Sequence, residues 1–152
     1  MKKILFVCLG NICRSPMAEF YFKDYIKRHG AAERYEVASA GTSGEEAGNP
    51  VYPPARRKLA ENGIDAAGKR ARRLTAADGA YYDVILAMDM HNVRDARRIV
   101  GEENARKVVR LLELAGEARD VADPWYTGDF DATMRDVEKG CKALFALQEG
   151  KK

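Results

Sequence analysis

The feature that most constrains the fold is a hydrophobic run that leads into a tight loop and then an amphipathic helix, all within the first 30 residues. Ile4 to Val7 is a β-branched and aromatic run typical of a buried parallel strand. After a loop at 8–15, Ser15 is predicted to cap a helix whose first residue is Pro16. This order directs backbone N–H groups and the positive end of a helix dipole at one point. We therefore predict an N-terminal phosphate-binding loop.

The residue types in this loop indicate a thiol that acts on a bound phosphate. Cys8 ends the strand, where inward-facing amides and the helix dipole favour the thiolate form. Arg14, six positions later, can fold back and offer two parallel N–H donors to phosphate oxygens. The alternative, a buried structural cysteine with Arg14 in solvent, is disfavoured because the loop also contains Gly and Asn and runs into Ser-Pro. The other positions expected to line the phosphate site are Leu9, Gly10, Asn11, Ile12, Cys13 and Ser15.

Hydrophobic periodicity in the rest of the chain predicts strands that alternate with helices. Further strands are expected at 35–38, 83–88 and 108–112, and helices at 16–29, about 54–62, 89–100 and from about 130 onward. Such alternation implies right-handed crossovers and a parallel sheet covered by helices on both faces. Ligands of such sheets bind beyond the carboxyl ends of the strands, which is where Cys8 stands. The predicted fold class is α/β.

Composition excludes several classes of protein. With 152 residues the chain is the size of one domain, so we assign residues 1–152 to a single domain. The net charge of +3, from 26 basic and 23 acidic residues, gives no indication of nucleic-acid binding. No apolar run approaches the roughly 18 residues of a membrane span. Three cysteines, an odd number, argue against a disulfide framework, and the N-terminal apolar run is too short for a signal peptide, so we predict a cytoplasmic protein.

Two motifs more than a hundred residues apart carry a family resemblance. Residues 7–19, VCLGNICRSPMAE, resemble the active-site loop of the low-molecular-weight protein tyrosine phosphatases, and 123–126, DPWY, resemble their second signature. Shorter matches at 39–42, 62–64, 70–72 and 87–89 extend the similarity over nearly the whole chain. The resemblance implies a single-domain, flavodoxin-like, four-stranded parallel sheet flanked by helices. No cofactor is expected, and no metal, because His29 and His91 lack metal-ligand spacing with the cysteines.

When the family's residue roles are transferred to the matching positions of this sequence, the resemblance implies a two-step hydrolysis. Cys8 attacks the phosphorus of phosphotyrosine, Arg14 and the loop amides hold the phosphate, and Asp123 protonates the leaving oxygen. Asp123 then activates the water that hydrolyses the cysteinyl-phosphate and releases inorganic phosphate. The expected partner is a phosphotyrosine-containing protein, with a tyrosine kinase as one candidate. Neither a nucleic acid nor a membrane is expected as a partner, and the enzyme is expected to be a monomer or a weak dimer.

The resemblance also implies supporting roles around this centre. Trp125 and Tyr126 are expected to form an aromatic wall beside the phenyl ring of the substrate. Ser39 matches a serine that ties down the phosphate loop through its asparagine. Cys13 is either inert packing or, as in relatives with a matching second cysteine, a redox partner that forms a protective disulfide with Cys8.

Two positions depart from the family pattern. The family often has an aromatic residue after its second strand, where this chain has Glu45 within the segment 44–46, so one wall of the cleft is expected to be acidic or open. Lys69 stands where the family has a histidine that supports the loop, and an ammonium group cannot accept a hydrogen bond as a neutral imidazole can. We therefore expect another group to support Asn11 and Ser15.

Three other functions use a related loop or fold. Protein arginine phosphatases usually carry threonine where this chain has Ile12, and the apolar side chain favours an aromatic substrate. Arsenate reductases need a further pair of cysteines in mid-chain, and none occurs between Cys13 and Cys141. Phosphocarrier domains lack the equivalents of Arg14 and Asp123. The sequence thus predicts a protein-tyrosine phosphatase, with arginine phosphatase as the first alternative and arsenate reductase as a less favoured one.

Overall fold

The computed structural model describes residues 1–150, which are arranged around one parallel sheet. Its four strands lie in the order β2-β1-β3-β4, and all three pairings are parallel. The strands are β1 (Lys2–Cys8), β2 (Tyr35–Gly41), β3 (Val84–Ala87) and β4 (Val108–Arg110). The expected single-domain α/β fold with a four-stranded parallel sheet is confirmed.

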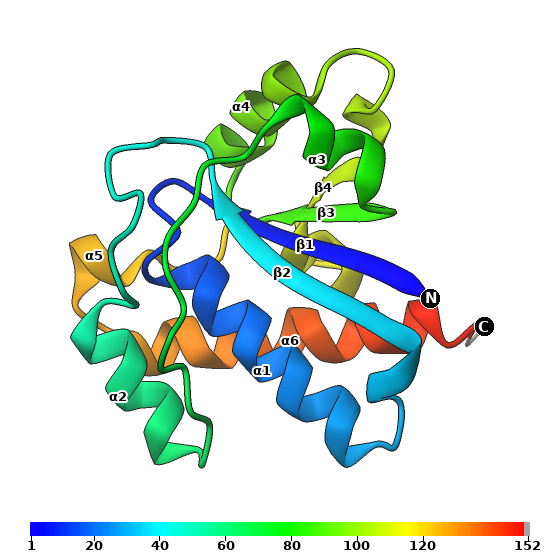
Figure 1. Ribbon diagram of the computed structural model, residues 1–152. Coiled ribbons are helices and arrows are strands. Elements are labelled where there is room, and N and C mark those ends of the chain that lie inside the picture. Colours follow the sequence, from blue (N-terminus) through cyan, green and yellow to red (C-terminus); the bar gives the residue numbers. More distant parts are fainter. Residues whose placement is uncertain (151–152) are drawn as a thin grey trace.

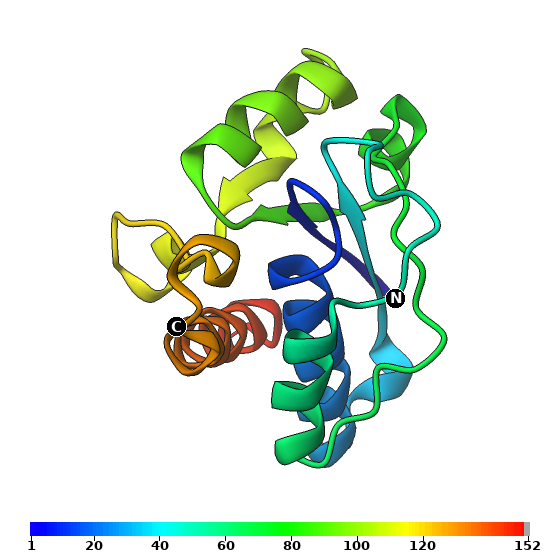
Figure 2. The ribbon, with the colours of Figure 1, turned by 90° about the vertical axis from the view of Figure 1, so that its left-hand side faces the viewer.

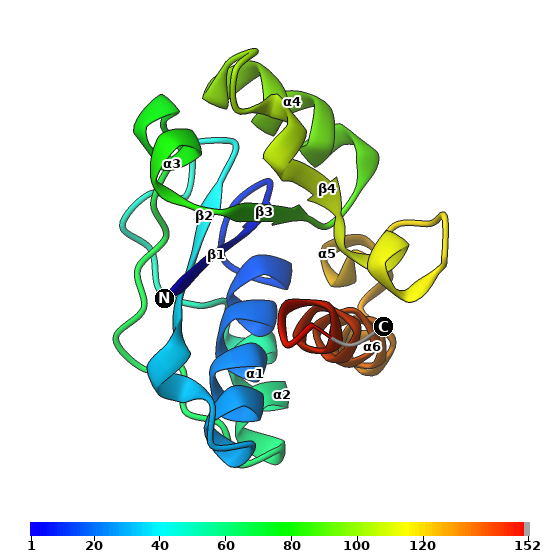
Figure 3. The same ribbon diagram turned by 90° about the vertical axis from the view of Figure 1, so that its right-hand side faces the viewer.

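Helices cover both sides of the sheet (Figure 1). One side carries α1 (Arg14–Arg28), α2 (Pro53–Glu61) and α6 (Phe130–Gln148), and the other carries α3 (Ala76–Tyr81) and α4 (Met90–Val100), as the side views in Figures 2 and 3 show. A single helical turn, α5 (Pro124–Thr127), precedes α6. Short 3₁₀ turns occupy Ala32–Arg34, Ala105–Lys107 and Leu111–Ala115. Among the described residues, no helix has the length and apolar character needed to cross a membrane.

The central strand β1 explains why the N-terminal run is apolar without alternation. Ile4 and Phe6 belong to the core cluster on the side of α1 and α6, whereas Leu5 and Val7 belong to the cluster on the side of α4. All four side chains are fully buried because side chains alternate between the two faces of a strand and both faces are covered. Phe6 also meets Phe22 of α1 edge to face, with ring centroids 5.9 Å apart.

The start of α1 differs from the sequence-based prediction. The helix begins at Arg14 rather than Pro16, its N-cap position is Cys13, and no side chain caps it. The predicted capping role of Ser15 is therefore wrong. Its hydroxyl is used elsewhere, because the Ser15 Oγ lies 3.0 Å from the Sγ of Cys8 at the end of β1.

Two strand ends differ as well. The second strand extends beyond the predicted 35–38 to Gly41, because every residue of β2 pairs with β1. The last strand ends at Arg110 instead of 112, and the chain enters a 3₁₀ turn in which Leu111 and Leu112 are buried in the core cluster that contains α6. The hydrophobic character of Leu111 and Leu112 therefore reflects packing against α6 and not a continuation of the strand.

The carboxyl ends of β1 and β2 meet at one edge of the sheet, on the left of Figure 1. The chain after β2 is joined to the loop after β1, since Thr42 N–H donates to Cys8 O at 2.9 Å and Ser43 N–H donates to Leu9 O at 3.0 Å. A Cβ atom on Gly41 would lie 2.7 Å from Leu9 O, so only glycine permits this approach. The backbone thus holds the loop after β1 from the side of β2.

Gly140 provides a test of the packing between α6 and the 3₁₀ turn. In an exposed helix, Gly→Ala stabilises a protein by about 1 kcal/mol. At Gly140 the added Cβ would lie 2.4 Å from Leu111 Cγ, so we expect Gly140→Ala to lower the free energy of unfolding by about 1–3 kcal/mol. Urea denaturation of the single variant measures this. In a Leu111→Ala background, which removes the overlapping methyl groups, the same change should no longer destabilise. A stabilised single variant would contradict this packing.

Candidate active site

The loop after β1 is built to receive an anion. Four of its carbonyl groups accept hydrogen bonds: besides the two bonds from the chain after β2, Ile12 O accepts from Tyr52 N–H at 2.9 Å and Cys13 O accepts from Met17 N–H at 3.0 Å. Asn11 adopts a left-handed conformation with φ of 59°, the only non-glycine residue with positive φ in the described chain. No backbone N–H of residues 10–13 has an acceptor in the described part of the chain. Such a ring of free amides at a helix start matches a phosphate group.

The sulfur of Cys8 contacts two polar groups of Ser15 at the base of this loop. Ser15 N–H donates to Cys8 Sγ at 3.4 Å, and the Ser15 hydroxyl lies 3.0 Å from the same sulfur. Both contacts come from the first turn of α1, so the sulfur lies beside the N-terminus of a helix. Cys8 itself is almost completely buried, and its sulfur projects into the pocket.

The guanidinium of Arg14 is buried and points at the same pocket. It donates to Asp89 Oδ2 at 2.9 Å and to Val121 O at 3.1 Å, and it lies 3.4 Å from Asp123 Oδ2. Burial by itself would lower the pKa of Arg14, but the negative charges of Cys8, Asp123 and Asp89 outweigh it and the pKa lies above its ordinary value. The arginine is therefore held charged and in one orientation before any phosphate binds.

Asp89 was not among the site residues that we predicted from the sequence. It lies two residues after β3, caps α4 by accepting from Asn92 N–H at 2.8 Å, and uses its other oxygen for Arg14. A signal was present, because an aspartate immediately after a buried strand lies at the edge where ligands of parallel sheets bind. From the sequence, Asp89 was placed at the start of the predicted helix 89–100, and that position does not reveal its contact with Arg14.

Asn11 links the loop to neighbouring elements from behind. Its amide N–H₂ donates to Ser15 Oγ at 2.8 Å and to Ser39 Oγ at 2.9 Å, and its carbonyl accepts from Arg72 N–H at 3.0 Å. Every hydrogen-bonding atom of the side chain is used, which holds the left-handed turn in place. Asn11 and Ser15 are buried behind the loop and do not line the pocket, although we expected both at the phosphate.

Lys69 supports this network by a route that the sequence did not reveal. Its ammonium group donates to Ser39 O at 3.0 Å and lies 3.4 Å from Glu19 Oε1, which accepts from the Ser39 hydroxyl at 2.6 Å. A lysine cannot accept a hydrogen bond, but the buried carboxylate of Glu19 can, and the lysine balances its charge. Burial lowers the pKa of Lys69, and the charge of Glu19 partly offsets this effect.

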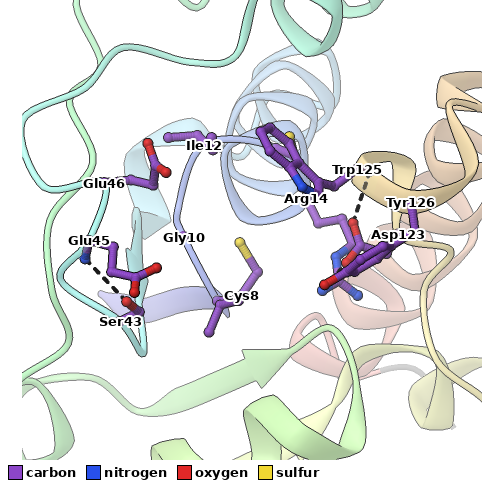
Figure 4. Close-up of a pocket in the computed structure, with 12 residues that line it drawn as sticks. Cys8, Gly10, Ile12, Arg14, Ser43, Glu45, Glu46, Asp123, Trp125 and Tyr126 are labelled. Atoms are coloured by element: carbon purple, nitrogen blue, oxygen red, sulfur yellow. Dashed lines mark hydrogen bonds and ion pairs between the residues drawn. The ribbon is translucent and has the colours of Figure 1, made fainter.

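Asp123 stands opposite Cys8 at the mouth of the pocket (Figure 4). Its Oδ1 accepts from Trp125 N–H at 3.0 Å and so caps α5, while Oδ2 faces Arg14. The side chain is 31% exposed, which leaves the carboxyl open to a ligand in the pocket. Pro124 is the first residue of α5 and fixes the backbone after the carboxylate.

The walls of the pocket differ in character. Trp125 and Tyr126 form one side and are 56% and 83% exposed, which leaves both rings open to a ligand in the pocket. Ser43, Glu45 and Glu46 lie on the opposite side, with both carboxylates directed toward the opening (Figure 4). The wall that we expected to be acidic or open is therefore acidic, and Glu46 adds a second carboxylate. Of the residues predicted from the sequence, the pocket is lined by Cys8, Leu9, Gly10, Ile12, Cys13, Arg14, Asp123, Trp125 and Tyr126.

Cys13 differs from Cys8 although both lie in the loop. Burial, together with the nearby Cys8 and Asp123, raises the pKa of Cys13 to about 12. Cys8, Cys13 and Cys141 are all free thiols in the structure, so a disulfide between Cys8 and Cys13 stays a prediction. No group of three or more His, Cys, Asp or Glu side chains within the described residues is arranged to hold a metal ion.

Comparison with known proteins gives consistent matches over the whole chain. The sequence profile described as "Low molecular weight phosphotyrosine protein phosphatase" matches residues 3–152. The low molecular weight protein-tyrosine-phosphatase YfkJ of Bacillus subtilis is 38% identical over 148 residues, which cover 96% of this chain and 95% of the relative. The human low molecular weight phosphotyrosine protein phosphatase is 36% identical over 151 residues, covering 94% of this chain and 93% of the relative.

Solved structures agree. The crystal structure of YfkJ superposes with a TM-score of 0.94 over 100% of this chain and 98% of the other, at 38% identity. An arginine phosphatase from Drosophila superposes with a TM-score of 0.90 over the full length of both chains, at 25% identity.

The difference between the loop cysteines can be tested by alkylation. At neutral pH we expect iodoacetamide to modify Cys8 first, because its sulfur faces the pocket and accepts from the Ser15 N–H, while burial raises the pKa of both Cys13 and Cys141. Peptide mass spectrometry locates the label, and inorganic phosphate should slow the reaction by filling the loop. The Cys8→Ser variant should take up label only slowly. Modification of Cys13 as fast as Cys8 would contradict the expected order.

Proposed function

The chain belongs to the low molecular weight phosphotyrosine protein phosphatases, and from this premise we propose that Cys8, Arg14 and Asp123 carry out its reaction. The observation that carries the assignment is the position of Arg14, which faces the nucleophilic sulfur and lies 3.4 Å from the Asp123 carboxylate in one pocket. The members of this family are cysteine-dependent hydrolases, so what remains to be assigned is the role of each residue in this chain.

In the first step, the Cys8 thiolate attacks phosphorus while the bond from phosphorus to the tyrosyl oxygen breaks. The free amides of residues 10–13 and the Arg14 guanidinium receive the charge on the non-bridging oxygens, and they are oriented for it beforehand. Asp123, in its protonated form, donates its proton to the departing oxygen. Tyrosine leaves, and a cysteinyl-phosphate remains.

In the second step, water attacks the phosphorus of the cysteinyl-phosphate. Asp123, now ionised, accepts a proton from this water, and the bond between sulfur and phosphorus breaks with return of its electron pair to the sulfur. The Ser15 N–H and hydroxyl stabilise the departing thiolate as they stabilised the attacking one. Inorganic phosphate is released and the starting state is restored.

The pocket walls favour an aromatic phosphoester. The exposed rings of Trp125 and Tyr126 and the apolar side chain of Ile12 surround the opening, so a phenyl ring would be in contact with carbon on more than one side. All proposed catalytic groups come from one chain, so the proposed site is complete within one protomer of the expected monomer or weak dimer. A reactive thiol requires a reducing compartment, which supports action in the cytoplasm. The proposed substrates there are phosphotyrosine-containing proteins, and a tyrosine kinase is one candidate.

A panel of phosphopeptides tests the substrate class. We expect rapid phosphate release from phosphotyrosine peptides and little release from matched phosphoarginine and phosphoserine peptides. Cys8→Ser should abolish turnover, because a hydroxyl is far less acidic than a thiol, while binding of the phosphotyrosine peptide persists. Phosphate release and calorimetric binding measure the two properties. Full activity of Cys8→Ser, or faster release from phosphoarginine than from phosphotyrosine, would refute the proposal.

The role of Asp123 can be separated from that of the nucleophile. We expect Asp123→Asn to lower kcat/KM by about 10²-fold or more for phosphotyrosine, which has a poor leaving group and needs a proton donor. The loss should be much smaller for p-nitrophenyl phosphate, because its leaving group departs as a stable anion. An equal loss for both substrates would remove Asp123 from the role of acid.

A further inference from the structure

The segment directly before Asp123 is held by all of its backbone polar groups. Val121 N–H donates to Met88 O at 2.9 Å, beyond the end of β3, and Val121 O accepts from Arg14 at 3.1 Å. Val121 is itself almost fully buried. One side of the segment is therefore attached to the sheet and to the proposed phosphate-binding arginine.

The other attachments come from α6. Ala122 N–H donates to Asp136 Oδ2 at 3.0 Å, and Ala122 O accepts from the Thr133 hydroxyl at 2.8 Å. Thr133 Oγ1 also lies 3.4 Å from Asp129 O, but the bond to Ala122 is the shorter one. Both α6 side chains are buried, at 0% exposed for Thr133 and 8% for Asp136. We call these two residues the α6 clamp.

Arg119 completes the clamp from the surface. Its guanidinium donates to Asp136 Oδ1 at 2.9 Å and to Oδ2 at 3.2 Å, which balances the charge of a buried carboxylate and fixes its orientation. Glu117 in turn accepts from Arg119 Nε at 2.7 Å. Asp136 is thus held in the orientation that meets the Ala122 N–H.

The clamp acts on the two peptide units that lead into Asp123, because Asp136 accepts from the Ala122 N–H in the first and Thr133 donates to the Ala122 carbonyl in the second. The Ala122 carbonyl belongs to the peptide bond that joins Ala122 to Asp123, so the hydrogen bond from Thr133 fixes the backbone from which the Asp123 side chain projects. Downstream, α5 offers less support, because it is a single turn whose Trp125 and Tyr126 are exposed. Proton transfer depends on distances of about 2.6–3.2 Å, so a small shift of this backbone affects it directly.

We propose that Thr133 and Asp136 are positioning residues that hold the Asp123 carboxyl over the leaving oxygen, a role that rests on the proposed acid function of Asp123. Neither residue lines the pocket or touches the phosphate. Their contribution is to the step in which a proton moves, and not to the binding of the phosphate or to the nucleophile.

The test compares Thr133→Val, which keeps the shape and removes the hydroxyl, with Thr133→Ser, which keeps the hydroxyl. The readout is kcat/KM for aryl phosphates whose leaving groups range from p-nitrophenol to unsubstituted phenol, because this ratio reports the first step. We expect Thr133→Val to lower kcat/KM about five-fold or more for phenyl phosphate and less than about two-fold for p-nitrophenyl phosphate. Thr133→Ser should restore the wild-type dependence. Asp136→Asn should resemble Thr133→Val.

Combination with Asp123→Asn separates positioning from general structural damage. If the clamp acts through Asp123, adding Thr133→Val to Asp123→Asn should cause little further loss for phenyl phosphate. A loss that is equal for all leaving groups, or that adds fully to that of Asp123→Asn, would overturn the clamp. Thermal unfolding identifies any variant that is unfolded. If Thr133→Val is unfolded, Thr133→Ser, which keeps the hydroxyl, is compared with the wild type instead.

The outcome for Asp123→Asn alone keeps the two proposals apart. If that variant shows a steep dependence on the leaving group while Thr133→Val and Asp136→Asn do not, the acid assignment stands and the clamp is wrong. If Asp123→Asn itself shows no dependence on the leaving group, the proposed acid is wrong and the clamp loses its basis.

Discussion

The buried guanidinium of Arg14 is the group on which the rest of the site depends. A buried cation needs compensation, and Arg14 receives it from Asp89 after β3, from the Val121 carbonyl and from Asp123 before α5. These groups come from two separate segments, so the charge of one arginine brings the end of β3 and the Asp123 segment to the loop after β1. The same guanidinium leaves the pocket side open to the oxygens of a phosphate. In the proposed function, one side chain thus provides both structural support and substrate binding.

A second network, on the far side of the loop, holds the turn itself. Hydrogen bonds made by every polar atom of the Asn11 side chain offset the energetic cost of its left-handed backbone conformation. Behind it, Ser39 connects to Glu19 and Lys69, which form a charged pair in place of a neutral histidine. The loop is therefore fixed from both sides before a ligand arrives, and little reorganisation is needed when charge develops on the phosphate.

Some parts of this arrangement could be predicted from local sequence and others could not. The apolar run of β1, followed by Cys8 and Arg14 at the required spacing, indicates a strand, a phosphate loop and a helix, and the fold agrees. Local rules failed at Ser15, where a serine before proline resembles a helix cap but lies inside α1 and contacts the sulfur of Cys8. They failed again at Leu111 and Leu112, because burial against α6 cannot be told from burial in a strand by hydrophobicity alone.

By itself, the sequence determined the parallel α/β class and the phosphate loop with its cysteine and arginine, because both depend on residue types at short spacing. The link from that loop to the distant aspartate motif came from the family resemblance of the two motifs. Only the tertiary structure decided that Asp89 compensates Arg14, that Lys69 acts through Glu19, and that Thr133 and Asp136 hold the backbone before Asp123. These contacts join segments that lie 11 to 75 residues apart. Which residues meet in these contacts depends on where the strands and helices end in three dimensions. A local sequence pattern does not contain that information.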